Sequence, residues 1–160
     1  MKIGVLTVSD SCAAGTREDL GGPAIKAWAL RQNWRVAHQK VVPDSPRAVS
    51  RVLRAWSAAG ADVILTTGGT GLGPRDNTPE ATAAVLDKEA PGIAEALRRE
   101  GCRHTPMAAL SRAVCGLRRR TLIINLPGSP RSLVESFPLL EVLIPHALAM
   151  MAGQGHEKHR

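Results

Sequence analysis

Aromatic residues are scarce in this chain. Its 160 residues include no tyrosine, one phenylalanine and three tryptophans. Proteins that bind single-stranded nucleic acid stack bases on aromatic side chains along a basic groove, and this chain has few such platforms. The formal net charge of +7 suits anionic partners of any kind, including phosphorylated small molecules. We therefore expect no specific nucleic-acid binding, with a salt-sensitive association through charge as the alternative.

Cysteine is rare as well, and its spacing argues against two common structural roles. Cys12, Cys102 and Cys115 are an odd number of thiols at wide intervals, so they match neither a disulfide framework nor a zinc signature. Cys102 and His104 lie two residues apart, but no second pair of metal ligands accompanies them. We therefore expect reduced cysteines and a cytoplasmic protein.

A long uninterrupted apolar run is also missing. The first residues, MKIGVLTVSDS, have neither the apolar stretch nor the cleavage site of a signal peptide, and they predict a strand. The most apolar segment, residues 137–151, is interrupted by Pro138, Glu141, Pro145 and His146. A membrane-spanning helix needs about 20 predominantly apolar residues, so we predict a buried helix there and no contact with a membrane.

Hydrophobic periodicity predicts strands that alternate with helices. The expected strands cover residues 2–8, 34–42, 62–67 and 121–126, and the expected helices cover residues 21–31, 46–59, 78–88 and 91–99, with a last helix from residue 130. Gly101 is the expected stop of the fourth helix. This alternation is typical of an α/β fold, here a three-layer sandwich with a mainly parallel sheet between helices. The length predicts one domain, at residues 1–152, followed by a basic flexible tail at residues 153–160.

Three of the strand-to-helix joints share one device. In Ser45-Pro46, Thr78-Pro79 and Ser129-Pro130, the hydroxyl residue is expected to cap the helix while proline takes its first position. In a parallel sheet these joints gather at the carboxyl ends of the strands, where ligands bind. Helix N-termini there present free N–H groups, which favours a phosphate ligand.

A glycine-rich loop follows the apolar run at residues 62–65. From residue 66 to residue 80 its sequence is TTGGTGLGPRDNTPE. Glycines adopt positive φ without a Cβ clash, so successive backbone N–H groups can form an anion-binding concavity. The loop matches neither the dinucleotide fingerprint nor the Walker loop with its lysine. It therefore predicts a phosphate-binding loop of another kind, and the segment 125–130 has the same form.

Two aspartates stand in these joints. Asp44 precedes Ser45-Pro46, and Asp76 lies between the glycine loop and Thr78-Pro79. Either carboxylate could simply brace a turn by accepting backbone N–H bonds. Alternatively, the pair suits Mg²⁺, which takes few carboxylates together with phosphate oxygens. No histidine lies beside these joints in the sequence, so positioning and charge neutralisation are favoured over a covalent nucleophile.

Five segments together carry a family resemblance. They are TVSDS at residues 7–11, VPD at residues 42–44, TTGGTGLGPRDNTPEAT at residues 66–82, ALSR at residues 109–112 and INLPGSP at residues 124–130. With these segments the chain resembles the molybdopterin adenylyltransferase family. The resemblance implies a three-layer molybdopterin-binding fold that assembles as a trimer. It also implies transfer of AMP from ATP to the terminal phosphate of molybdopterin with Mg²⁺, upstream of a molybdenum-insertion protein.

The resemblance also implies roles for individual residues. The catalytic and Mg²⁺-binding residues would be Asp44 and Asp76. The residues that bind molybdopterin and phosphate would be Ser9, Ser11, Gly68, Gly69, Thr70, Gly71, Ser111, Asn125, Pro127, Gly128 and Ser129. Two alternatives stay open at this point. One is a molybdopterin-binding carrier or paralogue without turnover, and the other is a hydrolase of dinucleotide-like pyrophosphates, which carries a similar TTGGTG loop.

Overall fold

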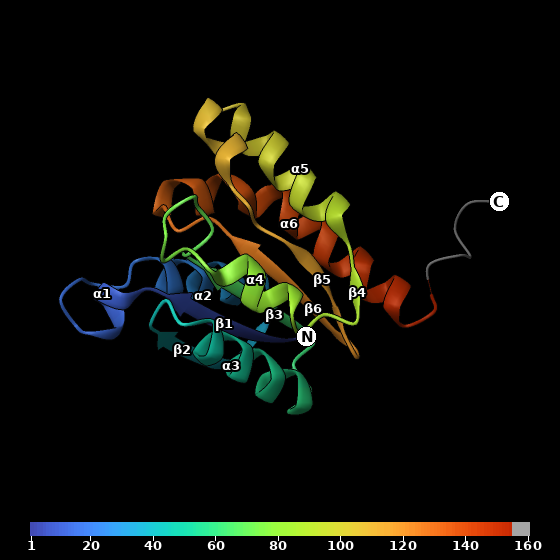
Figure 1. The fold of residues 1–160 in the computed structure, drawn as a ribbon. Coiled ribbons are helices and arrows are strands. Elements are labelled where there is room, and N and C mark those ends of the chain that lie inside the picture. Colours follow the sequence, from blue (N-terminus) through green and yellow to red (C-terminus); the bar gives the residue numbers. More distant parts are fainter. Residues whose placement is uncertain (155–160) are drawn as a thin grey trace.

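The computed structural model describes residues 1–154, which form a sheet of six strands with helices on both faces (Figure 1). In chain order the elements are β1 (Lys2–Val8), α1 (Asp10–Ala13), α2 (Gly21–Arg31), β2 (Arg35–Val42), α3 (Pro46–Ala58), β3 (Val63–Thr67), α4 (Thr78–Ala83), β4 (Lys88–Glu89), α5 (Pro91–Cys102), the 3₁₀ helix η1 (Pro106–Leu110), β5 (Cys115–Arg118), β6 (Thr121–Leu126) and α6 (Pro130–Met151).

The sheet is mainly parallel, as predicted. Its strand order is β2-β1-β3-β6-β5-β4. The four strands β2, β1, β3 and β6 pair in parallel, so their carboxyl ends lie along one edge. The short strands β5 and β4 continue the sheet in antiparallel pairing. Because β2 and β3 flank β1 on opposite sides, the strand order reverses at β1.

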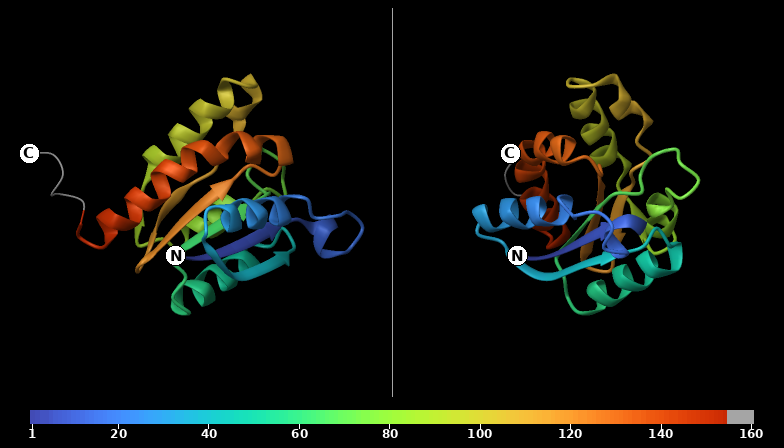
Figure 2. Two further views of the ribbon diagram at one scale, coloured as in Figure 1. Left: turned by 180° about the vertical axis from the view of Figure 1, so that it is seen from behind. Right: turned by 90° about the vertical axis from the view of Figure 1, so that its left-hand side faces the viewer.

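Two apolar cores produce the three layers, which the second view in Figure 2 shows nearly edge-on. Alternate residues of each buried strand point to opposite faces. Val63 and Leu65 of β3 join the core under α2, α5 and α6, whereas Ile64 between them joins the core under α3 and α4. The apolar runs of the central strands therefore reflect burial on both faces, and the predicted α/β sandwich is confirmed.

Several element boundaries differ from the prediction. Helix α4 ends at Ala83 because the following residues turn toward β4, and just before this strand the Asp87 N–H donates to the Leu117 carbonyl at 2.8 Å. Gly101 does not stop α5, which continues to Cys102. A Cβ on Gly101 would lie 2.8 Å from that of Ala108, so this glycine allows η1 to pack against the helix.

Helix α6 runs without a break through Pro138 and Pro145. Its length and composition would allow it to cross a membrane, but the core helices of many proteins meet the same criterion. One face packs on the sheet through Leu133, Phe137, Leu140 and Ile144, whereas other apolar side chains such as Val142 are exposed. The predicted burial therefore holds for one face only.

The predicted tail lies mostly outside the described residues. Of residues 153–160, only Gly153 and Gln154 are described. Their N–H groups donate to the carbonyls of Met150 and Ala149, at 3.0 and 2.9 Å, so these two residues close the last turn of α6.

Candidate functional site

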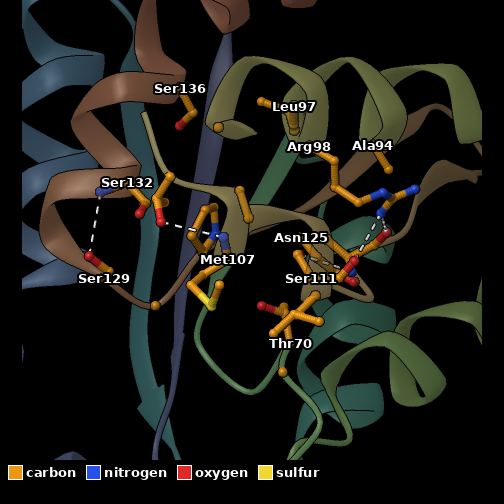
Figure 3. Close-up of a pocket in the computed structure, with 18 of the residues that line it drawn as sticks. Thr70, Ala94, Leu97, Arg98, Met107, Ser111, Asn125, Ser129, Ser132 and Ser136 are labelled. Atoms are coloured by element: carbon orange, nitrogen blue, oxygen red, sulfur yellow. Dashed lines mark hydrogen bonds between the residues drawn. The ribbon is translucent and has the colours of Figure 1, made fainter. Parts of the chain in front are cut away.

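A cavity of about 380 Å³ opens at the carboxyl ends of β3 and β6 (Figure 3). Its walls come from the glycine loop, from the segment after β6 and from α5, η1 and the first turns of α6. Most of the predicted site residues line it, namely Gly69, Thr70, Gly71, Asp76, Ser111, Asn125, Pro127, Gly128 and Ser129. The topology thus brings the end of β3 next to the segment after β6, where the Thr67 hydroxyl donates to the Pro127 carbonyl, 60 residues further along the chain.

The remaining predicted residues, Ser9, Ser11, Asp44 and Gly68, do not line this cavity. Ser9 and Gly68 line a smaller cavity that adjoins it. Ser11 lines neither cavity, and its Oγ lies 3.2 Å from the Oγ of Ser9. Asp44 lines neither cavity but reaches the glycine loop, because its Oδ1 lies 3.1 Å from the position that a Cβ on Gly69 would take.

The glycine loop requires its first two glycines, Gly68 and Gly69. Gly68 and Gly69 have φ angles of +95° and +64°, which side-chain-bearing residues rarely adopt. A Cβ on Gly68 would lie 2.3 Å from the carbonyl oxygen of Val8, and one on Gly69 would lie 2.4 Å from Oγ1 of Thr78. The loop backbone is therefore seated directly against β1 and α4, with no room for a side chain between them.

Both predicted catalytic aspartates brace the backbone with one oxygen. Oδ2 of Asp44 accepts the Asp10 N–H at 2.7 Å, and Oδ2 of Asp76 accepts the Gly73 N–H at 2.8 Å. Within residues 1–154, neither Oδ1 accepts a hydrogen bond. The turn-bracing role is thus present, and each carboxylate keeps a second oxygen for a ligand.

Asp10 ties the loop after β1 to the rest of the site. Its Oδ1 accepts the Asp44 N–H at 2.9 Å, and its two oxygens accept Nε and Nη2 of Arg75, each at 3.0 Å. The Arg75 side chain, followed by the Asp44 backbone, holds the pKa of Asp10 below its usual value. Asp10 therefore stays charged at neutral pH and links the Asp44 segment to the glycine loop.

Arg112 is a site residue that the sequence analysis missed. Its N–H donates to the Thr70 carbonyl at 2.9 Å, and its Nε donates to the Gly71 carbonyl at 2.7 Å. The rest of the guanidinium binds the Asp76 carbonyl and pairs with Glu80, whose pKa it lowers. The Arg112 side chain thus holds the glycine loop at Gly71 and at Asp76 and ties it to Glu80 of α4. The only sequence signal was its place beside Ser111.

A buried polar network supports the loop from beneath. Nδ2 of Asn125 donates to the hydroxyls of Thr66 and Thr82, both at 2.9 Å, and its Oδ1 accepts the Val114 N–H at 3.2 Å. Asn125 is only 1% exposed. Although it lines the cavity as predicted, the donor capacity of its side chain is already used within the protein.

Two of the three predicted helix caps are confirmed. The Ser45 and Ser129 hydroxyls accept from the N–H groups of Ala48 and Ser132. The prediction was wrong for Thr78, which begins α4 instead of capping it. Its N–H donates to the Gly69 carbonyl at 3.1 Å, and its buried Oγ1 has no partner within the described residues.

The far wall of the cavity is aliphatic. Leu97 of α5 and Met107 of η1 face it, and Arg98 closes one side by donating to the carbonyls of Ser111 and Ala113 at 3.3 and 2.9 Å (Figure 3). No aromatic residue among residues 1–154 lines the cavity. A flat ligand in this site would therefore be held by aliphatic side chains and polar loops.

The site contains no preformed metal cage. Among residues 1–154, no group of three or more histidine, cysteine, aspartate or glutamate side chains could hold a metal ion. The donor set still fits Mg²⁺, which binds through one or two carboxylates together with phosphate oxygens and water. The Oδ1 atoms of Asp44 and Asp76, which accept no hydrogen bond in the described part of the chain, are donors of that kind.

Comparisons with known proteins agree with this geometry. A family model described as "Probable molybdopterin binding domain" matches residues 4–146. The crystal structure of the molybdopterin biosynthesis enzyme MoaB from Thermus thermophilus is 49% identical, with a TM-score of 0.89, and the match covers 98% of this chain and 99% of that one. A molybdopterin adenylyltransferase from Haemophilus influenzae is 39% identical over 85% of this chain and 71% of its own length.

Longer relatives contain the same unit. A molybdenum cofactor biosynthesis bifunctional protein from Synechococcus elongatus is 43% identical over 95% of this chain, which spans only 48% of that relative. The family model matches most of the chain, and the sheet order and the glycine loop agree with that match. The chain belongs to the molybdopterin-binding domain family.

Proposed function

We propose that this protein is a molybdopterin adenylyltransferase, which transfers AMP from ATP to the terminal phosphate of molybdopterin. The observation that carries the proposal is the position of two aspartates at the glycine loop. Asp44 approaches Gly69, Asp76 approaches Gly71, and each keeps one carboxylate oxygen without a partner in residues 1–154. The adenylyltransferases among the relatives, such as that of Haemophilus influenzae, support this assignment.

The reaction is a single displacement at phosphorus. A terminal phosphate oxygen of molybdopterin forms a new bond to the α-phosphorus of ATP. The bond between that phosphorus and the oxygen that bridges to the β-phosphate breaks, and pyrophosphate leaves with the electron pair. Phosphoryl-type transfer of this kind depends on positioning and charge stabilisation, which loop N–H groups and a metal ion held by fixed carboxylates would supply without a covalent intermediate.

Asp44 and Asp76 would hold Mg²⁺ together with phosphate oxygens, and bound Mg²⁺ would neutralise charge on the phosphates. Arg112 keeps the loop that carries Thr70 and Gly71 in place while the substrates bind. The aliphatic wall at Leu97 and Met107 would accommodate the pterin.

The setting of the reaction is part of the proposal. We place the protein in the cytoplasm because the three cysteines, all within the described residues, are free thiols. The exposed apolar side of α6, which includes Val142, would pack in a homotrimer. Adenylylated molybdopterin would pass to a separate molybdenum-insertion protein.

The test is an anaerobic assay with molybdopterin, Mg²⁺ and ATP labelled at the α-phosphate. Asp44→Asn and Asp76→Asn are expected to lower the rate of label transfer at least about 100-fold, since lost electrostatic stabilisation of a transition state has effects of that size. Asp87→Asn is the matched control, because Asp87 also braces a turn by accepting the Arg119 N–H but lies at the β5–β6 turn, at the opposite end of β6 from the cavity.

A carrier without turnover is the alternative function. It predicts that the wild-type protein binds molybdopterin while no label reaches the pterin. If transfer occurs but Asp76→Asn transfers label as fast as Asp87→Asn, the catalytic role of Asp76 is wrong. Melting temperatures of all three variants would show whether a lost turn, not lost chemistry, explains a slower rate.

A further inference from the structure

A second cavity adjoins the one that would hold the pterin. Its volume is about 250 Å³, and its walls come from the end of β1, residues 17–21, the end of β3 and the start of α6. Gly128 lines both cavities, and Gly68 lines the smaller one while its neighbour Gly69 lines the larger one. The first glycines of the loop therefore form a thin wall between two compartments.

The smaller cavity lies where the strand order of the sheet reverses. It contacts Thr7, Val8 and Ser9 at the end of β1, and Thr67 and Gly68 at the end of β3. Helix α2 leaves β1 on one face of the sheet, and α3 packs on the opposite face. In open α/β sheets, ligands bind outside the carboxyl ends of the strands at such a reversal. The topology alone thus favours a ligand here.

Arg17 gives this cavity a cation. Its Nη2 donates to Oγ of Ser9 at 3.1 Å, and Ser9 is only 7% exposed, so a buried group holds the guanidinium. Within residues 1–154, no carboxylate forms an ion pair with Arg17. The guanidinium therefore keeps most of its five N–H donors for an anion.

Asp19 and Glu18 also line the smaller cavity, but their carboxylates do not cancel its preference for an anion. Asp19 is already occupied, because it accepts the Thr7 hydroxyl at 2.8 Å and the Gly22 N–H at 3.0 Å. Glu18 is exposed to solvent, as Arg17 is, but only the Arg17 side chain is held in place by a hydrogen bond to the buried Ser9. The first residues of α2 and α6, Gly21 and Pro130, also line the cavity, so the positive ends of two helices add to the charge of Arg17.

We propose that the smaller cavity binds the β- and γ-phosphates of the nucleotide, with Arg17 as their binding residue. This inference rests on the proposed adenylyl transfer. In that reaction the attacking and leaving oxygens lie on opposite sides of the α-phosphorus. Two compartments separated by Gly68 and Gly69 provide this arrangement, with the pterin phosphate in the larger one and the leaving pyrophosphate in the smaller one.

The test measures binding without turnover. Calorimetric titration of the 160-residue protein with pyrophosphate and Mg²⁺ would compare the wild type with Arg17→Gln. We expect pyrophosphate affinity to fall at least about tenfold, because a charge-assisted hydrogen bond to phosphate is lost. Arg17→Gln should leave molybdopterin affinity unchanged. Arg54→Gln, an exposed arginine on α3 away from both cavities, is the matched control and should not alter either affinity.

The outcomes separate this inference from the proposed function. If Arg17→Gln binds pyrophosphate as tightly as the wild type, the inference is wrong, even where the wild type transfers AMP. Equal loss of pyrophosphate and molybdopterin affinity would also overturn it, because Arg17 would then not distinguish the two compartments. If the wild type binds pyrophosphate through Arg17 but transfers no AMP, the anion site stands and the adenylyltransferase proposal fails.

Discussion

Substitution of Gly68 by alanine tests the role of the glycine loop most sharply. The φ angle of +95° costs an L-residue about 1–2 kcal/mol. In addition, the new Cβ would lie 2.3 Å from the Val8 carbonyl, so the loop or β1 must move, and such overpacking costs about 1–3 kcal/mol. We therefore expect the free energy of unfolding to fall by roughly 2–5 kcal/mol, or the melting temperature by roughly 4–20 °C at this chain length.

The matched control is Gly92→Ala. Gly92 is exposed in the first turn of α5, has no positive φ, and a Cβ there would meet nothing within 4 Å. Alanine should stabilise the protein there by roughly 0.5–1 kcal/mol, since it lowers the entropy of the unfolded chain. Thermal unfolding followed by circular dichroism measures both variants. An unchanged melting temperature for Gly68→Ala would refute the proposed seating of the loop against β1.

Three further outcomes follow from the site. Arg112→Gln should lower the rate of adenylyl transfer at least about tenfold, because hydrogen bonds from a charged group to the glycine loop are lost. Arg103→Gln, at an exposed position, is the control and should not lower the rate. Equal rates for the two variants would contradict the role of Arg112. Asn125→Leu should lower the free energy of unfolding by roughly 2–4 kcal/mol, because the hydrogen-bonding groups of Thr66, Thr82 and Val114 lose their buried partner. Urea titration measures this change, and an unchanged urea midpoint would contradict it. Burial raises the pKa of the Cys115 thiol to about 12, from 9.0 for an unfolded thiol. Because mainly the unfolded state loses its thiol proton between these values, the free energy of unfolding falls as the pH rises, and Cys115→Ala should reduce that fall. An identical pH profile for wild type and variant would contradict this.

Most of the fold could be predicted because its signals are local. The buried strands at residues 2–8 and 121–126 are apolar runs, and Ser45 and Ser129 cap helices that begin with proline. Strands β4 and β5 gave no such signal, since they are short and depend on pairing with each other and with β6. Thr78 was predicted to be a cap because it precedes a proline, as Ser45 and Ser129 do. The prediction was wrong because the Thr78 N–H binds the Gly69 carbonyl, a contact that the Thr-Pro pattern does not reveal.

The loops of the candidate site could be predicted from the sequence, but the arginines that hold or flank these loops could not. The glycine loop and the segment after β6 stand out in the sequence through unusual composition. Arg112 and Arg98 act through backbone carbonyls of other segments, and Arg17 acts beside a topological reversal. Long-range contacts of this kind leave no periodicity or motif, so a surface arginine and a loop-holding arginine look alike in the sequence.

Transfer of AMP from ATP to molybdopterin is the central proposal for this protein. The direct measurement uses two parallel anaerobic reactions of the wild-type protein with Mg²⁺ and molybdopterin, one with ATP labelled at the α-phosphate and one with ATP labelled at the γ-phosphate. We expect α-label to appear on the pterin while γ-label leaves as pyrophosphate in equal amount. Molybdopterin that binds while both labels stay in ATP would contradict it and favour the carrier.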